Sequence, residues 1–163
     1  MQEAFHKLVQ DFGLKFGIDD LEVGADEELQ LMFEDDFALT LSYQPEEHWV
    51  RIDIKVMDCL HESEERTAQI AGLLMKLNFL ARTQNHAWAS FTANEEVYIT
   101  NHKNIDHLDP DLLADTIEFM LSQADNLKGT LQSFSSRSQE PTSPTGQETQ
   151  PNPTVSGQQF IKA

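Results

Sequence analysis

The chain has 163 residues, and its 28 acidic side chains against 11 basic ones give a formal net charge of −17. Nucleic acid is a poor partner for such a chain, because neutralising phosphates needs clustered lysine and arginine, and an anionic membrane surface is disfavoured for the same reason. The one cysteine, Cys59, excludes an intramolecular disulfide, and no apolar run is long enough to be inserted into a membrane. We therefore expect a cytoplasmic protein.

The first third of the sequence predicts a helix followed by a strand hairpin. Apolar residues three and four positions apart form one helical stripe that ends near Gly17, and its members are Phe5, Leu8, Val9, Phe12 and Phe16. Apolar and polar residues then alternate over 29–33 and 37–43, on either side of the acidic turn 34–36. A third alternating stretch covers 49–57, and the short connections favour antiparallel neighbours.

The following residues predict a second helix, two shorter strands and a third helix. Ser63 is a suitable N-cap for the second helix, whose apolar stripe is the most regular in the chain: Ile70, Leu73, Leu74, Leu77 and Leu80. The strands are expected over 88–92 and 96–100. Asp109 and Pro110 start the third helix, and Gly129 is near its end.

These elements predict one domain over residues 1–132. Its fold class is α+β, an antiparallel sheet with three helices in the order α-β-β-β-α-β-β-α. Residues 133–163 are mostly Ser, Thr, Pro, Gln and Gly and hold few side chains that could anchor a core. Such a segment cannot offset its ordering entropy, so we predict that 133–163 is a disordered tail.

No catalytic or cofactor signature accompanies this pattern. The sequence lacks the glycine-rich phosphate loops, the HExxH zinc motif and the GxSxG nucleophile motif. His61 and Glu65 are four residues apart, but they straddle a helix start, so we interpret them as solvated. The stretch 101–111 carries two histidines and three aspartates without the spacing of a metal loop. We predict no catalytic residue, no metal and no cofactor.

One face of the predicted sheet should be exposed to water, yet it carries large apolar and aromatic side chains. The alternation places on it Met32, Trp49, Met57 and Tyr98. Exposed methionines and aromatic residues often mark adaptable binding surfaces. Either a partner protein binds this face, or helices or a second subunit cover it.

The order of elements in an acidic body resembles the class I type III secretion chaperones, the family that includes the Tir chaperone. Three stretches within residues 1 to about 131 carry the resemblance. FGLKFGIDDLEVGADEELQLMFEDDFALTLSY resembles the end of the family's first helix and its opening hairpin, and LLMKLNFLARTQNHAWASFTANEEVYIT resembles its second helix and next strand pair. LDPDLLADTIEFMLSQADNL resembles the closing helix.

The resemblance implies a non-enzymatic homodimer that binds the N-terminal, non-globular segment of a secreted effector. By the family's pattern, the second helix and the next strand form the dimer interface, which nominates Leu73, Leu77, Leu80 and Trp88. The effector segment would contact the first helix and the sheet, which nominates Phe5, Val9, Phe12, Leu31, Phe33 and Trp49. All of these residues could instead belong to the monomer core.

Two other interpretations of the residues stay open at this point. One is a small α+β enzyme whose site is built from dispersed carboxylates and histidines. The other is an acidic protein that inhibits a basic regulator or nuclease by mimicking nucleic acid, although the acidic residues gather in turns and at helix starts.

Overall fold

The computed structural model describes residues 2–18, 21–33, 37–81 and 87–137. Across these ranges the chain forms three α-helices, five strands and one short 3-10 turn, which confirms the predicted order and the α+β class. Their bounds are α1 Gln2–Phe16, β1 Glu28–Met32, β2 Ala38–Gln44, β3 Trp49–Asp58, α2 Glu64–Ala81, β4 Trp88–Phe91, β5 Glu96–Asn104, η1 Ile105–His107 and α3 Pro110–Arg137.

The strands form one antiparallel sheet in the order β1-β2-β3-β5-β4, so that β1 and β4 are its edges. The register pairs Leu41 with Ile52 and Ile54 with Ile99, which places the apolar positions of neighbouring strands on the same face. We call this the inner face. A β-bulge between Lys55 and Met57 interrupts the pairing of β3 with β5.

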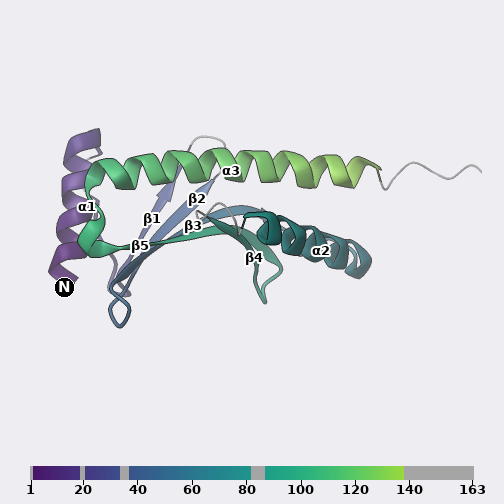
Figure 1. Cartoon of the computed structure of the whole chain (residues 1–163), viewed down its shortest axis with the longest axis horizontal. Helices are drawn as coiled ribbons and strands as arrows, with labels where there is room; N and C mark the ends of the chain where they lie inside the picture. Colours follow the sequence, from purple (N-terminus) through teal and green to yellow (C-terminus); the bar gives the residue numbers. More distant parts are fainter. Residues whose placement is uncertain (1, 19–20, 34–36, 82–86, 138–163) are drawn as a thin grey trace, which may run out of the picture.

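Helix α3 runs along the inner face and packs on β3 and β5, while α1 packs against α3 and α2 packs beside β4 (Figure 1). The core therefore lies between one sheet face and α1 and α3. Its fully buried side chains include Phe5, Val9, Leu39, Leu41, Val50, Ile52, Ile54, Ile70, Val97, Leu113, Met120 and Leu131. An ion pair between Lys15 and Asp111 joins the end of α1 to the start of α3.

The helix ends use the capping chemistry that the sequence predicted. Gly17 has a φ of 65°, and the N–H of Ile18 donates to the carbonyl of Gly13 at 2.9 Å, which together end α1 in a Schellman motif. The Ser63 hydroxyl accepts from the N–H of Arg66 at 3.2 Å. The Asp109 carboxylate accepts from the N–H of Leu112 at 2.8 Å, with Pro110 as the first residue of α3.

Helix α3 continues past Gly129, where the sequence predicted its end, and reaches Arg137. The continuation has a packing reason, since Leu131 is fully buried and its carbonyl accepts from the Arg66 guanidinium at 2.9 Å. The first residues of the predicted tail, 133–137, are therefore helical. The remainder of that predicted tail, 138–163, lies outside the described residues, as does the predicted turn 34–36.

Candidate functional site

Helix α2 carries apolar side chains on two of its sides, one toward the core and one toward solvent. Ile70 and Leu74 are buried in the protomer core, and Leu73 and Leu77 are half-buried against it. Two other large apolar side chains of α2 are exposed, Met75 at 74% and Phe79 at 75%. Large apolar side chains exposed next to each other are typical of a surface that a partner protein contacts.

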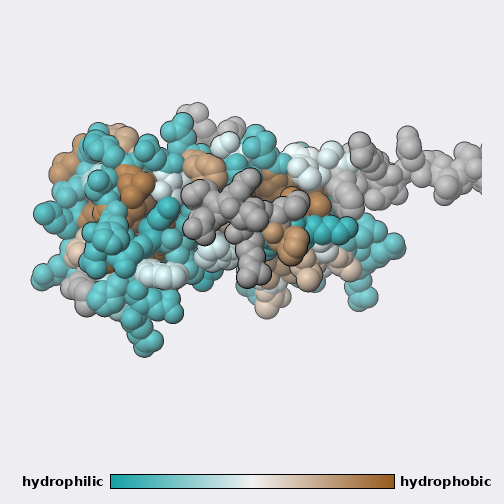
Figure 2. Space-filling model, in the orientation of Figure 1, coloured by the Kyte–Doolittle hydropathy of each residue, from teal (hydrophilic) through white to brown (hydrophobic). Residues whose placement is uncertain are grey.

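We define the α2 surface as Met75 and Phe79, which are four residues apart and so lie on one side of the helix, whereas Leu73 and Leu77 lie on the side toward the core. Hydrophobic residues gather in Figure 2 over the region that α2 and β4 occupy in Figure 1. A cavity of about 220 Å³ lies between β4 and α3 beside this surface, lined in part by Leu77, Trp88 and Phe119. Three of the four nominated dimer residues, Leu73, Leu77 and Trp88, are thus at this end of the molecule, while the side chain of Leu80 lies outside the described residues.

The β4 edge of the sheet is closed by a side chain from α2. The Asn78 amide nitrogen donates to the carbonyl of Ala89 at 2.6 Å, and the Asn78 amide oxygen accepts from the N–H of Ala89 at 2.8 Å. One side chain therefore satisfies both backbone groups that Ala89 would offer to a further strand. The same pair of bonds fixes α2 beside β4 and so sets the orientation of the α2 surface.

Replacing Asn78 by alanine is expected to lower the free energy of unfolding by about 1 to 3 kcal/mol, because the half-buried N–H and carbonyl of Ala89 lose both partners. Urea denaturation followed by circular dichroism measures the change. The matched control is Gln69→Ala, which removes an exposed bond to Glu65 on the same helix and should change stability by less than about 0.5 kcal/mol. Equal effects of the two substitutions would show that the Asn78 bonds contribute nothing.

On the outer face of the sheet, opposite the core, three aromatic side chains lie in a row across β3, β5 and β4. The ring centroids of Trp49 and His102 are 5.2 Å apart, and those of His102 and Trp88 are 4.9 Å apart. Trp49 is 40% exposed and Trp88 is 42% exposed. We call these three residues the aromatic row.

The aromatic row has no cation of its own at neutral pH. Burial, and secondly the neighbouring Arg51, lower the pKa of His102 from its ordinary value of 6.5. The Nε2 atom of His102 is buried without a hydrogen-bond partner among the described residues. The Arg51 guanidinium is paired with the Asp53 carboxylate at 2.7 Å, and Asp53 also accepts from the Thr100 hydroxyl at 2.6 Å.

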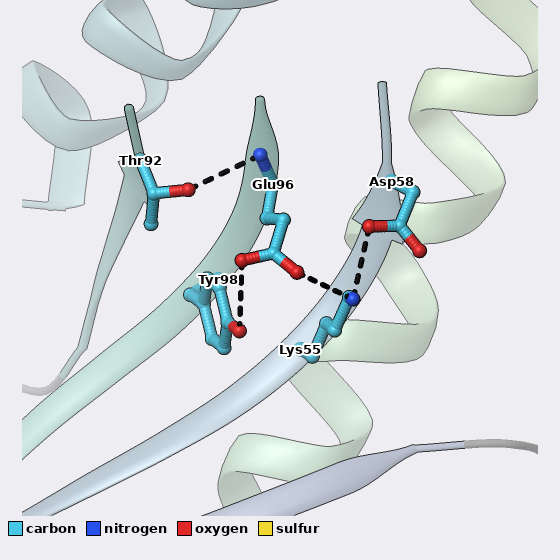
Figure 3. A network of polar contacts seen from close by, with 5 residues as sticks. All are labelled: Lys55, Asp58, Thr92, Glu96 and Tyr98. Atoms are coloured by element: carbon cyan, nitrogen blue, oxygen red, sulfur yellow. Dashed lines mark hydrogen bonds and ion pairs between the residues drawn. The ribbon is translucent and has the colours of Figure 1, made fainter. Parts of the chain in front are cut away.

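A second polar cluster on the outer face is structural (Figure 3). The Lys55 ammonium is 2.6 Å from a Glu96 carboxylate oxygen and 2.9 Å from Asp58. Tyr98 donates its hydroxyl hydrogen to the other Glu96 oxygen at 3.3 Å. Hydrogen bonds to Glu96 and then to Asp58 raise the pKa of Lys55, and burial raises the pKa of Tyr98. Both groups therefore keep their protons at neutral pH, so neither is available as a general base.

The outer face differs from its prediction at one residue. Met57 is directly opposite Val97, which is fully buried, so the bulge between Lys55 and Met57 turns Met57 toward the core side. The expectation that Met57 lies on the water-exposed face was therefore wrong. Met32, at 73% exposure, and Trp49 are exposed there as predicted, and Tyr98 is half-buried.

The residues nominated for effector binding fall into two groups. Phe5, Val9 and Phe12 of α1 are buried in the protomer core. Leu31 and Phe33 are half-buried along β1 and just after it, and Trp49 belongs to the aromatic row. The structure brings the first group against the inner face of the sheet, whereas only the second group reaches the surface. Their roles in binding stay predictions.

Reactive and metal-binding groups do not converge in the described part of the chain. No three His, Cys, Asp or Glu side chains within it come together in the way that a metal ion needs. Cys59 is fully buried, and burial raises the pKa of its thiol, so it is a poor nucleophile. None of the described helices is both long enough and apolar enough to cross a membrane.

The sequence profile of the Tir chaperone protein (CesT) family matches residues 7–128. The chain belongs to this family. It is therefore a type III secretion chaperone, which binds effectors and catalyses no reaction, and the predicted cytoplasmic location is that of the family. A search of curated proteins found no match.

Solved structures share the chaperone's fold at low sequence identity. A chain of the HopA1–SchA chaperone–effector complex has a TM-score of 0.68 at 11% identity, over 78% of this chain and 95% of its own. A chain of the ExsC–ExsE complex has a TM-score of 0.70 at 16% identity, over 80% and 96% respectively. The Yersinia pestis type III secretion chaperone SycH in complex with a fragment of YscM2 gives 0.59 at 11% identity, over 76% and 98%.

Proposed function

We propose that this chaperone acts as a homodimer and holds the N-terminal, non-globular segment of a secreted effector in extended form. The observation that carries the dimer is the α2 surface, because Met75 and Phe79 are large apolar side chains on one side of α2 and are largely exposed. A second copy packed on this surface would remove both side chains from water. Chains with the same fold occur in a chaperone–effector complex, which supports effector binding by this fold.

The proposed dimer interface is formed by α2 together with the adjacent end of β4. The family's pattern nominates Leu73, Leu77, Leu80 and Trp88 for it, and Met75 and Phe79 join them as exposed apolar side chains of α2. The cavity beside Leu77 and Phe119 offers space for an apolar side chain of the second copy. Because Asn78 closes β4 at Ala89, the copies would associate through side chains rather than by pairing their β4 edges.

The proposed effector site includes the free edge of β1. The N–H of Phe33 donates to the carbonyl of Phe37, and the N–H of Tyr43 donates to the carbonyl of Glu27. In this antiparallel alternation the odd-numbered residues of β1 bond to β2, so the backbone groups of Gln30 and Met32 are directed to the open edge. An extended effector segment can pair there, with Leu31 and Phe33 as apolar contacts. Trp49, on the outer face of β3, would contact a different part of the segment. Phe5, Val9 and Phe12 would support this site by holding α1 on the sheet.

Affinity purification of the tagged chaperone from cells that make the secretion system tests the proposal. We expect one dominant co-purifying protein, identified by mass spectrometry, and a complex mass from light scattering that contains two chaperone copies. Limited proteolysis of the complex should leave the N-terminal part of that protein protected. A monomeric chaperone, or a bound protein protected elsewhere in its chain, would contradict the corresponding part of the proposal.

A further inference from the structure

We propose that the aromatic row is a subsite for an arginine or lysine side chain of the bound effector segment. This inference rests on the proposed function, since it assigns part of the effector-binding surface a chemical preference. Trp49 and Trp88 flank His102, and each tryptophan leaves two fifths of its surface open to solvent on the outer face of the sheet. An open indole face attracts a cation more strongly than the face of any other aromatic side chain.

The charges around the aromatic row favour a cationic occupant. The chaperone has a formal net charge of −17, so a basic segment is drawn to it at long range. Arg51, the cation that lowers the pKa of His102, is engaged by the Asp53 carboxylate at 2.7 Å. Asp53 and Glu47 are both close enough to influence His102 electrostatically, and each adds negative charge near it. A neutral imidazole between the two indoles completes a surface that does not repel a cation.

The arrangement of the strands explains why these three residues meet. Trp49 is opposite Asn104, Arg51 is opposite His102, and Trp88 is opposite Thr100. His102 is therefore diagonal to both tryptophans, at a spacing that long aromatic side chains can bridge. A segment lying across β3, β5 and β4 would pass over all three rings.

The two tryptophans in the sequence are both in the aromatic row, so tryptophan fluorescence reports on this subsite. Because Trp88 is also nominated for the dimer interface, light scattering checks that the peptides leave the mass of the chaperone unchanged. The probe is the acetylated and amidated peptide Val-Arg-Val-Arg-Val, and its control is the same peptide with citrulline, the neutral isostere of arginine. Titrations in 0.5 M NaCl screen the long-range attraction to the acidic body. We expect the citrulline peptide to bind about 2- to 5-fold more weakly, the range that one solvent-exposed cation–π contact gives.

Two variants separate a cation–π contact from general charge attraction. Labelling the chaperone with 5-fluorotryptophan keeps its shape and net charge but weakens the negative potential on the indole face. The ratio of the dissociation constants of the citrulline and arginine peptides should therefore fall toward one. In the double variant Trp49→Leu, Trp88→Leu, whose peptide binding is measured by calorimetry, the two peptides should have equal dissociation constants. Equal binding of the two peptides by the unaltered chaperone, or a difference that survives both changes, would overturn the proposal.

The same experiments keep this inference apart from the proposed function and from the dimer. If an effector co-purifies but the two peptides bind equally, only the cationic subsite fails. If no effector co-purifies, the proposed function fails while the peptide comparison still reads the aromatic row. Should the leucine variant lose its dimer mass in light scattering, Trp88 belongs to the dimer interface, and the fluorotryptophan result, in which the shape is unchanged, decides the subsite.

Discussion

Replacing Met75 and Phe79 together by aspartate is expected to halve the mass of the chaperone in light scattering. Both side chains are exposed in the protomer, so the protomer fold should survive the change. In a closed dimer interface an unpaired charge costs about 3 to 5 kcal/mol, which raises the dissociation constant by a factor of at least about 100. The double variant should therefore be monomeric at micromolar concentration.

The companion variant Leu73→Asp, Leu77→Asp tests the residues nominated from the sequence. It is also expected to break the dimer, but Leu73 and Leu77 pack partly against the protomer core, so part of its effect falls on folding. Circular dichroism separates the two effects. The matched control is Leu14→Asp, because Leu14 is 82% exposed on α1, away from the α2 surface. A Met75→Asp, Phe79→Asp variant that keeps the mass of two copies would refute the α2 interface.

The local elements could be predicted from the sequence because each depends on near neighbours. The spacing of Phe5, Leu8 and Phe12 places them on one stripe of α1, and the structure buries all three. Ser63 and Asp109 were recognisable as N-caps because a cap needs only a short polar side chain before a helical stripe. The antiparallel order of the first three strands followed from the short turns between them.

Features that depend on register were not predictable in the same way. The bulge that turns Met57 inward depends on how β3 pairs with β5, residues far apart in the sequence. The aromatic row needs the same long-range register. The bond pair between Asn78 and Ala89 depends instead on how α2 packs beside β4, which the apolar spacing of α2 does not specify. Gly129 suggested a helix end, but tertiary contacts of Leu131 outweighed the modest cost of glycine inside a helix.

The exposed apolar side chains of α2 are predictable from the sequence. Met75 and Phe79 are four residues apart and fall outside the apolar stripe that the sequence predicts for α2. A projection of α2 places Met75 and Phe79 in a second apolar stripe, which Glu65, Gln69 and Lys76 separate from the core-facing stripe. A second apolar stripe is itself a signal of a covered surface. For α1 the stripe alone was ambiguous, because a buried face and a binding face have the same apolar spacing.

Replacing Phe5 by alanine settles that ambiguity for α1. Phe5 is fully buried and stacks on Tyr43 with ring centroids 5.8 Å apart, so removing its ring leaves a cavity in the core. We expect the free energy of unfolding to fall by about 3 to 5 kcal/mol in urea denaturation. The control Leu14→Ala changes an exposed residue of the same helix and should shift stability by less than about 0.5 kcal/mol. If Phe5→Ala instead left stability unchanged and weakened effector binding, Phe5 would face the effector, and α1 would have to leave the sheet when the effector binds.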